Sequence, residues 1–184
     1  MQTFLPYPSF LASAASLDMK RLGKQRVECL QILNSILNIN PNSRGWINHP
    51  CTKMWTNHPS ALLSYSITVC DAWTRRGYKD TVKEKLLNLF SDNRSAFHDL
   101  LNFSISAPYV EVVGIGETGA EIYGIAQSGP IFNVEITYNY GPSWLGDEDL
   151  HLSHQSNLIR KNPEFYRQRF GPNVPDNLPY IWPV

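Results

Sequence analysis

The chain of 184 residues has the length of one compact domain, and its composition of 42% hydrophobic, 12% aromatic and 17% charged residues excludes a wholly disordered protein. Sixteen Lys and Arg residues balance sixteen Asp and Glu residues, so total charge gives no reason to expect a polyanion as partner. No apolar run approaches the ~18 residues that a membrane span needs, which predicts a protein with no membrane partner.

The neutral total hides two halves of opposite charge. Residues 1 to 90 hold eleven Lys and Arg and five Asp and Glu, whereas residues 91 to 184 hold five and eleven. A local cluster of cations sets the field that a ligand meets, so the first half could present a basic face to phosphates. Alternatively, the two halves attract each other within the fold.

The three cysteines, Cys29, Cys51 and Cys70, are odd in number and widely spaced. Neither a disulfide framework nor a paired metal-binding motif follows from that spacing, and we expect reduced thiols. The N-terminal stretch has no basic segment of the kind that opens a signal peptide. These features predict a cytoplasmic protein, nucleoid-associated or in the host cytoplasm if viral.

Helical periodicity dominates the first half of the chain. Apolar residues recur at helical spacing from about 16 to 38, with Ser16 or Asp18 as the N-terminal cap. Pro59 opens a second helix that ends at Gly77, and Asp80 caps a third over about 81 to 90.

The residue pattern changes after residue 106. β-branched and aromatic residues at 109–113, 121–123 and 131–138 alternate with Gly-rich turns, which predicts a three-stranded meander. Helical spacing resumes after Asp147 and ends near Pro163, before an extended tail that Tyr180 and Trp182 anchor. The fold class is therefore mainly α: one helical domain over 1–184, with an acidic β-rich insertion over 86–143 and antiparallel strands at about 107–140.

Two motifs favour ordinary structural roles. Residues 114–119 fit GxGxxG, but Gly124, Gly129 and Pro130 follow where a dinucleotide site needs a helix, so a glycine turn between strands explains them better. His151 and His154 lie one helical turn apart, and catalytic zinc usually takes three protein ligands. We expect neither a metal nor another cofactor, and polar contacts of these histidines to the fold or to a ligand.

The segment Leu17–Glu28 carries the most informative charges. On a helix, Arg21, Lys24 and Glu28 fall on one side, and Lys20 adds a cation beside them. Taken alone, this pattern favours an exposed helix with an ordinary Lys24–Glu28 pair worth a few tenths of a kcal/mol.

Several separated motifs change that interpretation. They occur in the order Arg21-Leu-Gly-Lys-Gln-Arg-Val-Glu28, Trp46-Ile-Asn-His-Pro50, Met54-Trp55, Trp73-Thr-Arg-Arg-Gly-Tyr-Lys-Asp-Thr81 and His151-Leu-Ser-His-Gln-Ser-Asn-Leu-Ile-Arg-Lys161. Together they resemble the pyrimidine dimer DNA glycosylase (endonuclease V) family, in its broader bacterial and phage branch. The resemblance spans residues 1 to about 85 and 144 to 184.

The resemblance implies a helical, metal-independent enzyme that excises cyclobutane pyrimidine dimers from duplex DNA. In this family an amine at the start of the chain attacks C1′, and a Schiff base then permits strand cleavage by β-elimination. A helix glutamate does the acid/base work, and its counterpart here is Glu28. An α-amino group has an ordinary pKa of about 7.7–8, against ~10.4 for lysine, so more of it is free base at neutral pH.

The identity of the nucleophile stays open in the sequence. The family's characterised nucleophile is a threonine exposed by loss of Met1, but position 2 is Gln2, which is too bulky for that processing. The amine is then that of Met1, or a lysine such as Lys20 or Lys24 carries the lyase chemistry, or lyase activity is missing. Residues expected to contact DNA are the following: Arg21, Lys24, Arg26, Lys53, Arg75, Arg76, His154, Asn157, Arg160 and Lys161.

Two other functions fit the same residues. One is a non-catalytic DNA-binding protein whose β insertion meets a protein partner, and the other is an enzyme that modifies DNA bases without excising them. Borohydride trapping of a covalent DNA adduct distinguishes the glycosylase that forms a Schiff base from these two alternatives.

Overall fold

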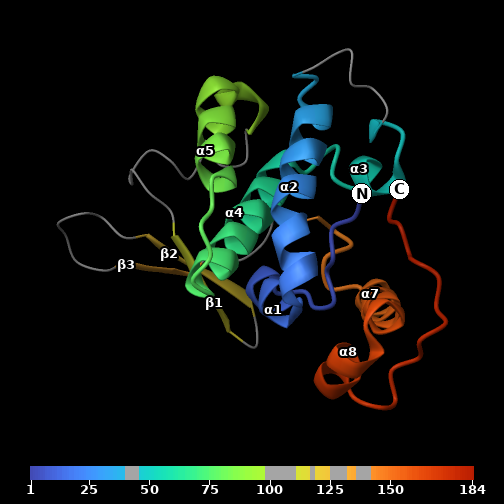
Figure 1. Cartoon of the computed structure of the whole chain (residues 1–184). Helices are drawn as coiled ribbons and strands as arrows, with labels where there is room; N and C mark the ends of the chain where they lie inside the picture. The colour runs from blue at the N-terminus through green and yellow to red at the C-terminus, as the bar shows by residue number, and fades with distance from the viewer. Residues whose placement is uncertain (40–45, 98–110, 117–118, 125–131, 136–141) are drawn as a thin grey trace.

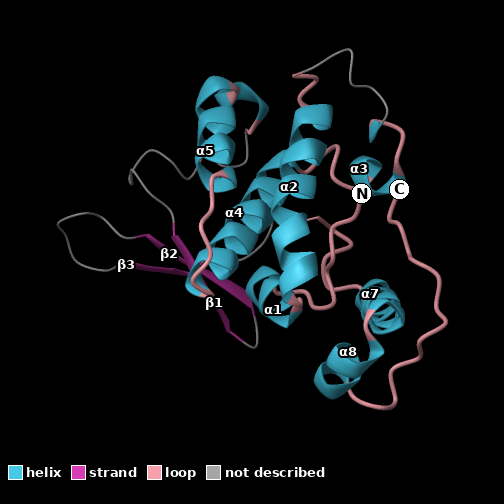
Figure 2. Cartoon of the chain, in the orientation of Figure 1, coloured by secondary structure: helices cyan, strands magenta, loops and turns pink. Residues whose placement is uncertain are grey.

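The protein is mainly helical in the computed structural model, which describes residues 1–39, 46–97, 111–116, 119–124, 132–135 and 142–184 (Figures 1 and 2). The helices are α1 (Phe10–Ser16), α2 (Met19–Ile36), α3 (Pro50–Lys53), α4 (Pro59–Arg75), α5 (Val82–Asp92), the 3-10 helix η2 (Arg94–Ala96), α7 (Glu148–Lys161) and α8 (Pro163–Phe170). Each long helix predicted from the sequence is present, with ends shifted by a few residues. The mainly helical fold class is thus confirmed.

Side-chain caps explain where the helices begin. Asp18, one of the two predicted caps, accepts a hydrogen bond from the Arg21 amide and starts α2. Asp80 accepts from the amides of Val82 and Lys83 at the start of α5. Asp147 caps α7 by accepting from the amide of Asp149.

The helices α2 and α4 pack against each other at the centre of the molecule, with α1 against α4 and α5 against both (Figure 1). Gly23 of α2 permits this close approach, because a Cβ atom there would lie 2.9 Å from the Trp73 ring of α4. Buried apolar side chains from these helices form one core, which includes Leu22, Ile32, Leu62 and Val69.

Three short strands have the backbone order β1 (Glu111–Gly116), β2 (Gly119–Gly124) and β3 (Phe132–Glu135), all antiparallel. Gly116 of β1 pairs with Gly119 of β2. The remainder of the predicted insertion lies outside the described residues. The insertion as a unit, and the single-domain organisation, therefore stay predictions.

The C-terminal part packs beside the N-terminal segment. α7 and α8 contact each other, and the tail after Phe170 runs without helix or strand back toward α3, so that both chain ends lie near α3 (Figure 1). Tyr180 and Trp182 pack against the core, as the sequence predicted for the tail. Among the described residues, no helix is long and apolar enough to cross a membrane.

Candidate active site

The first six residues form no helix or strand, so their backbone polar groups need other partners. Figure 1 shows this segment passing between α2 and α7. Side chains from α2, α3, α4 and α7 bind its backbone: Gln25, Cys51, Tyr65, His151, His154 and Gln155. The start of the chain is thereby fixed in place from several sides.

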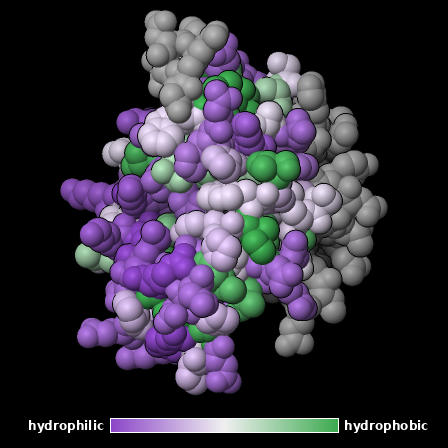
Figure 3. Space-filling view, turned by 90° about the vertical axis from the view of Figure 1, so that its right-hand side faces the viewer, coloured by the Kyte–Doolittle hydropathy of each residue, from purple (hydrophilic) through white to green (hydrophobic). Residues whose placement is uncertain are grey.

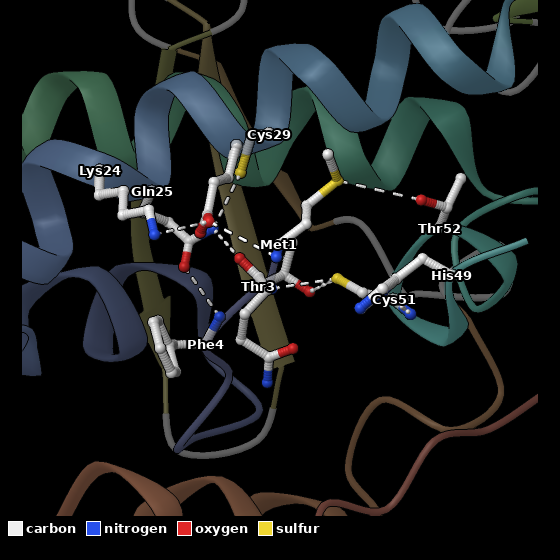
Figure 4. Close-up of polar contacts among 11 residues, drawn as sticks. Met1, Thr3, Phe4, Lys24, Gln25, Cys29, His49, Cys51 and Thr52 are labelled. Carbon is white, nitrogen blue, oxygen red and sulfur yellow. Dashed lines mark hydrogen bonds and ion pairs between the residues drawn. The ribbon is translucent and has the colours of Figure 1, made fainter. Parts of the chain in front are cut away.

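Gln25 of α2 is fully buried and uses both ends of its amide. Its Nε2 donates to the Gln2 carbonyl at 2.6 Å, and its Oε1 accepts from the Phe4 amide at 2.9 Å (Figure 4). Thr3 adds a contact to α3, because its amide donates to Cys51 Sγ at 3.2 Å. These contacts flank Met1 on its C-terminal side and set the direction in which the first residue points.

The two α7 histidines hold Leu5. His154 Nδ1 accepts from the Leu5 amide at 2.9 Å, and His151 Nδ1 lies 2.7 Å from the Leu5 carbonyl, to which it donates. Burial, with a smaller effect of His151, lowers the pKa of His154 to about 3, so the ring is neutral. Both histidines therefore contact the fold, which is one of the roles that their spacing predicted.

The Met1 α-amino group lies 3.8 Å from Glu28 Oε1. Glu28 is 6% exposed, and its Oε1 also lies 3.4 Å from Lys24 Nζ, whose side chain is largely exposed. The Met1 side chain packs toward α3, where Thr52 Oγ1 donates to its sulfur at 4.0 Å (Figure 4). Sequence reasoning named Glu28 and Met1 as catalytic, and the structure brings them together.

Cations from α2 and α7 surround this carboxylate. Arg21 donates to the backbone carbonyl of Lys161 at 2.9 Å. Burial, followed by the charges of Arg21, Arg160 and Lys24, lowers the pKa of Lys161, while Glu28 opposes that change. The ends of two helices distant in sequence thus place positive groups beside Glu28.

The face formed by α7, α8 and the tail is rich in hydrophilic residues in its lower part (Figure 3).

Each ion pair of the described residues joins groups from the same half of the chain. Attraction between the two oppositely charged halves therefore does not account for these pairs.

Several residues expected to contact DNA have partners within the protein. Arg26 pairs with Asp80 and lies over the Trp73 ring, and Arg76 donates to the carbonyls of Ala15 and Leu17. The buried Asn157 side chain donates to the carbonyls of Ser153 and Leu178, and buried His154 holds Leu5. In this arrangement these four side chains support the fold.

The other predicted DNA contacts are more accessible. Lys24, Lys53, Arg75, Arg160 and Lys161 are exposed, while Arg21 is engaged with Asp18 and the Lys161 carbonyl. Lys24 pairs with Glu28, and Lys161 is close enough for Glu28 to affect its pKa. Arg160 precedes Lys161 and donates to Asn157 Oδ1 and the Asp176 carbonyl. This subset can approach a phosphate without breaking the helix packing.

Sequence reasoning assigned no role to Gln25 or His49. His49 caps α3 by accepting from the Cys51 amide, and its ring lies 6.0 Å from that of Trp182. Burial, then the Met1 amino group, lowers the pKa of His49, while Glu28 opposes this change. The Asn48-His49-Pro50 motif was the available signal for His49, whereas no local pattern marks Gln25.

The site therefore combines an α-amino group, a buried carboxylate and nearby cations of α2 and α7. Residues 1–86 match the family model described as pyrimidine dimer DNA glycosylase. This match confirms, over those residues, the family that the sequence motifs predicted. Comparisons with curated proteins and with solved structures found no match.

Proposed function

We propose that this protein is a DNA repair enzyme that excises dimerised pyrimidines from duplex DNA and cleaves the resulting abasic site. The 3.8 Å separation of the Met1 α-amino group from Glu28 Oε1 carries this proposal, because it joins a nucleophile to an acid/base group. The family match over residues 1–86 supports the substrate class.

In the proposed reaction, the free-base amine of Met1 attacks C1′ of the damaged nucleotide. The new N–C1′ bond replaces the glycosidic bond, whose electron pair leaves with the base. Opening of the sugar ring then gives an iminium between Met1 and C1′. Glu28 takes the C2′ proton, the electron pair of the C2′–H bond forms a C2′–C3′ double bond, and the C3′–O bond breaks so that the 3′ phosphate leaves.

The surrounding cations support two parts of this reaction. Lys24 Nζ forms an ion pair at 3.4 Å with Glu28 Oε1, the carboxylate that accepts the C2′ proton in this reaction. Arg160 and Lys161, in the last turn of α7, are the residues that we propose contact phosphates of the bound DNA.

The test is sodium borohydride trapping with a duplex that contains an abasic site. The proposal expects a covalent adduct on the peptide that begins at Met1, with intact mass verifying that Met1 is present. An adduct on Lys20 or Lys24 would move the nucleophile to a lysine. Retained DNA binding with no adduct would support a non-catalytic protein.

Glu28→Gln provides the matched variant, since it keeps the size of the side chain and removes the charge. We expect it to slow strand cleavage at least 100-fold, within the ~10²–10⁴-fold range of general acid/base catalysis, while DNA affinity changes little. Undiminished cleavage would remove Glu28 from the mechanism. Gln31→Leu, on the exposed side of α2, is the control for nonspecific effects on this helix.

A further inference from the structure

Four buried polar atoms near the start of the chain have no hydrogen-bond partner: Gln2 Nε2, Gln2 Oε1, His154 Nε2 and Tyr180 Oη. Gln2 is 8% exposed and His154 is fully buried. Because an unpaired buried polar group costs about 1–3 kcal/mol, such a concentration of them requires an explanation.

The four atoms belong to neighbouring side chains. The rings of His154 and Tyr180 have centroids 5.4 Å apart. Burial raises the pKa of Tyr180, and a side-chain hydrogen bond with Gln2 is one of the smaller effects that lower it. Tyr180 is thus a neighbour of both Gln2 and His154, but its contact with Gln2 falls short of the distance and angle of a full hydrogen bond.

This cluster is adjacent to the proposed catalytic pair. Gln2 follows Met1 directly, and Gln25 fixes its carbonyl at 2.6 Å. A nucleotide whose C1′ faces the Met1 amine has its base within reach of the next residue, since the base is attached to that same carbon.

The hydrogen-bonding capacity of the cluster is well defined. His154 Nδ1 accepts from Leu5, so the proton of the neutral ring is on Nε2, which is a donor. The Gln2 amide offers one donor group and one acceptor, and the Tyr180 hydroxyl can do either. Two donors, one acceptor and one adaptable group are thus available.

A pyrimidine edge complements this set. Thymine presents two carbonyl acceptors around an N–H donor, and cytosine presents two acceptors and an amino donor. Guanine presents two donors and one acceptor, which is the poorer match. We propose that Gln2, His154 and Tyr180 form a recognition site for the Watson–Crick edge of a pyrimidine held at Met1, an inference that rests on the proposed function.

The tail covers this site. Residues 178–182 have no helix or strand, and they are held to α7 by three hydrogen bonds: Leu178 N to Ser156 Oγ, Asn157 Nδ2 to Leu178 O, and Ile181 N to Ser153 Oγ. These bonds hold Tyr180, which belongs to the same stretch, beside His154.

Two variants test the site without altering the Met1 amine or Glu28. Gln2→Leu removes the amide but keeps a bulky second residue, so that Met1 is retained, and Tyr180→Phe removes only the hydroxyl. Gln31→Leu again serves as the control. Intact mass and thermal unfolding verify that each variant starts at Met1 and is folded.

Two readouts separate base recognition from amine chemistry. Borohydride trapping with an abasic duplex involves no base at the reacting sugar and should stay within about twofold of the parent protein. Binding is measured in the Glu28→Gln background, with a thymine-dimer duplex against the same duplex carrying a tetrahydrofuran abasic analogue. The preference for the dimer should fall at least tenfold for Gln2→Leu and severalfold for Tyr180→Phe.

Each other outcome has a defined meaning. An unchanged preference in both variants would overturn the inference and leave a cluster that holds only buried water. A parallel loss of trapping would overturn it by making Gln2 a support for the amine alone. If the parent protein traps no abasic DNA, the proposed function fails, while the binding preference still decides whether these residues recognise a pyrimidine.

Discussion

His154 is the residue at which burial and charge conflict most directly. It is fully buried and accepts from the Leu5 amide, so protonation would both remove the acceptor and place a charge in the core. The pKa of His154 is therefore lowered from its ordinary value of 6.5 to about 3.

A pH dependence of stability follows from that pKa. Between pH 6.5 and 3 the unfolded chain binds a proton at His154 that the folded protein does not, so stability falls as the pH falls through this window. From pH 7.5 to 5 we expect this residue to reduce the free energy of unfolding by about 2 kcal/mol.

Denaturant unfolding at both pH values provides the measurement. His154→Gln keeps an acceptor for Leu5 but cannot titrate, so its loss of stability over the same window should be smaller by a similar amount. An identical pH dependence in the variant and the parent protein would contradict the prediction, whatever the stability of the variant at pH 7.5.

How much of the site is visible in the sequence depends on the kind of residue. Glu28 and Met1 were predicted because a charged helix segment and a family resemblance point to them. Gln25 and Gln2 carry no such signal, because their roles arise from backbone contacts between segments 23 positions apart. Long-range hydrogen bonds leave no periodic pattern in a sequence.

At the scale of elements, the crossing of α2 and α4 depends on Gly23. Alanine is a better helix former by ~1 kcal/mol, but its Cβ would lie 2.9 Å from the Trp73 ring. We expect Gly23→Ala to destabilise the protein by about 1–3 kcal/mol, the usual cost of overpacking.

A double-mutant cycle checks the cause. In a Trp73→Phe background the smaller ring leaves space, so Gly23→Ala should cost less than in the parent protein, or stabilise through helix propensity. Equal costs in both backgrounds, measured by thermal unfolding, would show that Trp73 is not the obstacle.

The long helices were predictable because each has both a cap and an apolar stripe, as for Asp18 and α2 or Asp147 and α7. The short helices α1 (Phe10–Ser16), α3 and α8 were missed. Prolines and small residues in these segments obscure any helical period, and helices of 7, 4 and 8 residues depend on tertiary contacts more than on local preference.

At the scale of the whole molecule, the cations divide into structural and accessible groups. Arg26 is held by Asp80 and Trp73, whereas Lys161 is exposed beside Arg160 and Lys24. The first group stabilises the fold, and the second is exposed to solvent. Sequence charge alone could not separate them, since both groups contribute equally to the basic total.

Lys161→Ala should weaken duplex binding and reduce the dependence of log K on log[salt] by about 0.9, the expected loss of one phosphate contact. Its thermal stability should change little. Arg26→Ala should show the opposite result, with a lower melting temperature because Asp80 loses its partner, and with a similar salt dependence in the folded protein.

Binding titrations at several salt concentrations, together with thermal unfolding of both variants, measure the two effects. An unchanged salt dependence for Lys161→Ala would show that Lys161 does not contact a phosphate. Lys53 and Arg75 are then the next exposed residues to replace.

The fixed position of Met1 between α2 and α3 has a practical consequence for anyone who prepares this protein. A purification tag fused before Met1 would convert its amine into a peptide amide, which is not a nucleophile. The tag would also have to pass Glu28 and Thr52, which contact Met1. Val184, the last residue, is 75% exposed and accepts such a tag without this loss. Inactivity of a protein tagged at its N-terminus would therefore not test the proposed function.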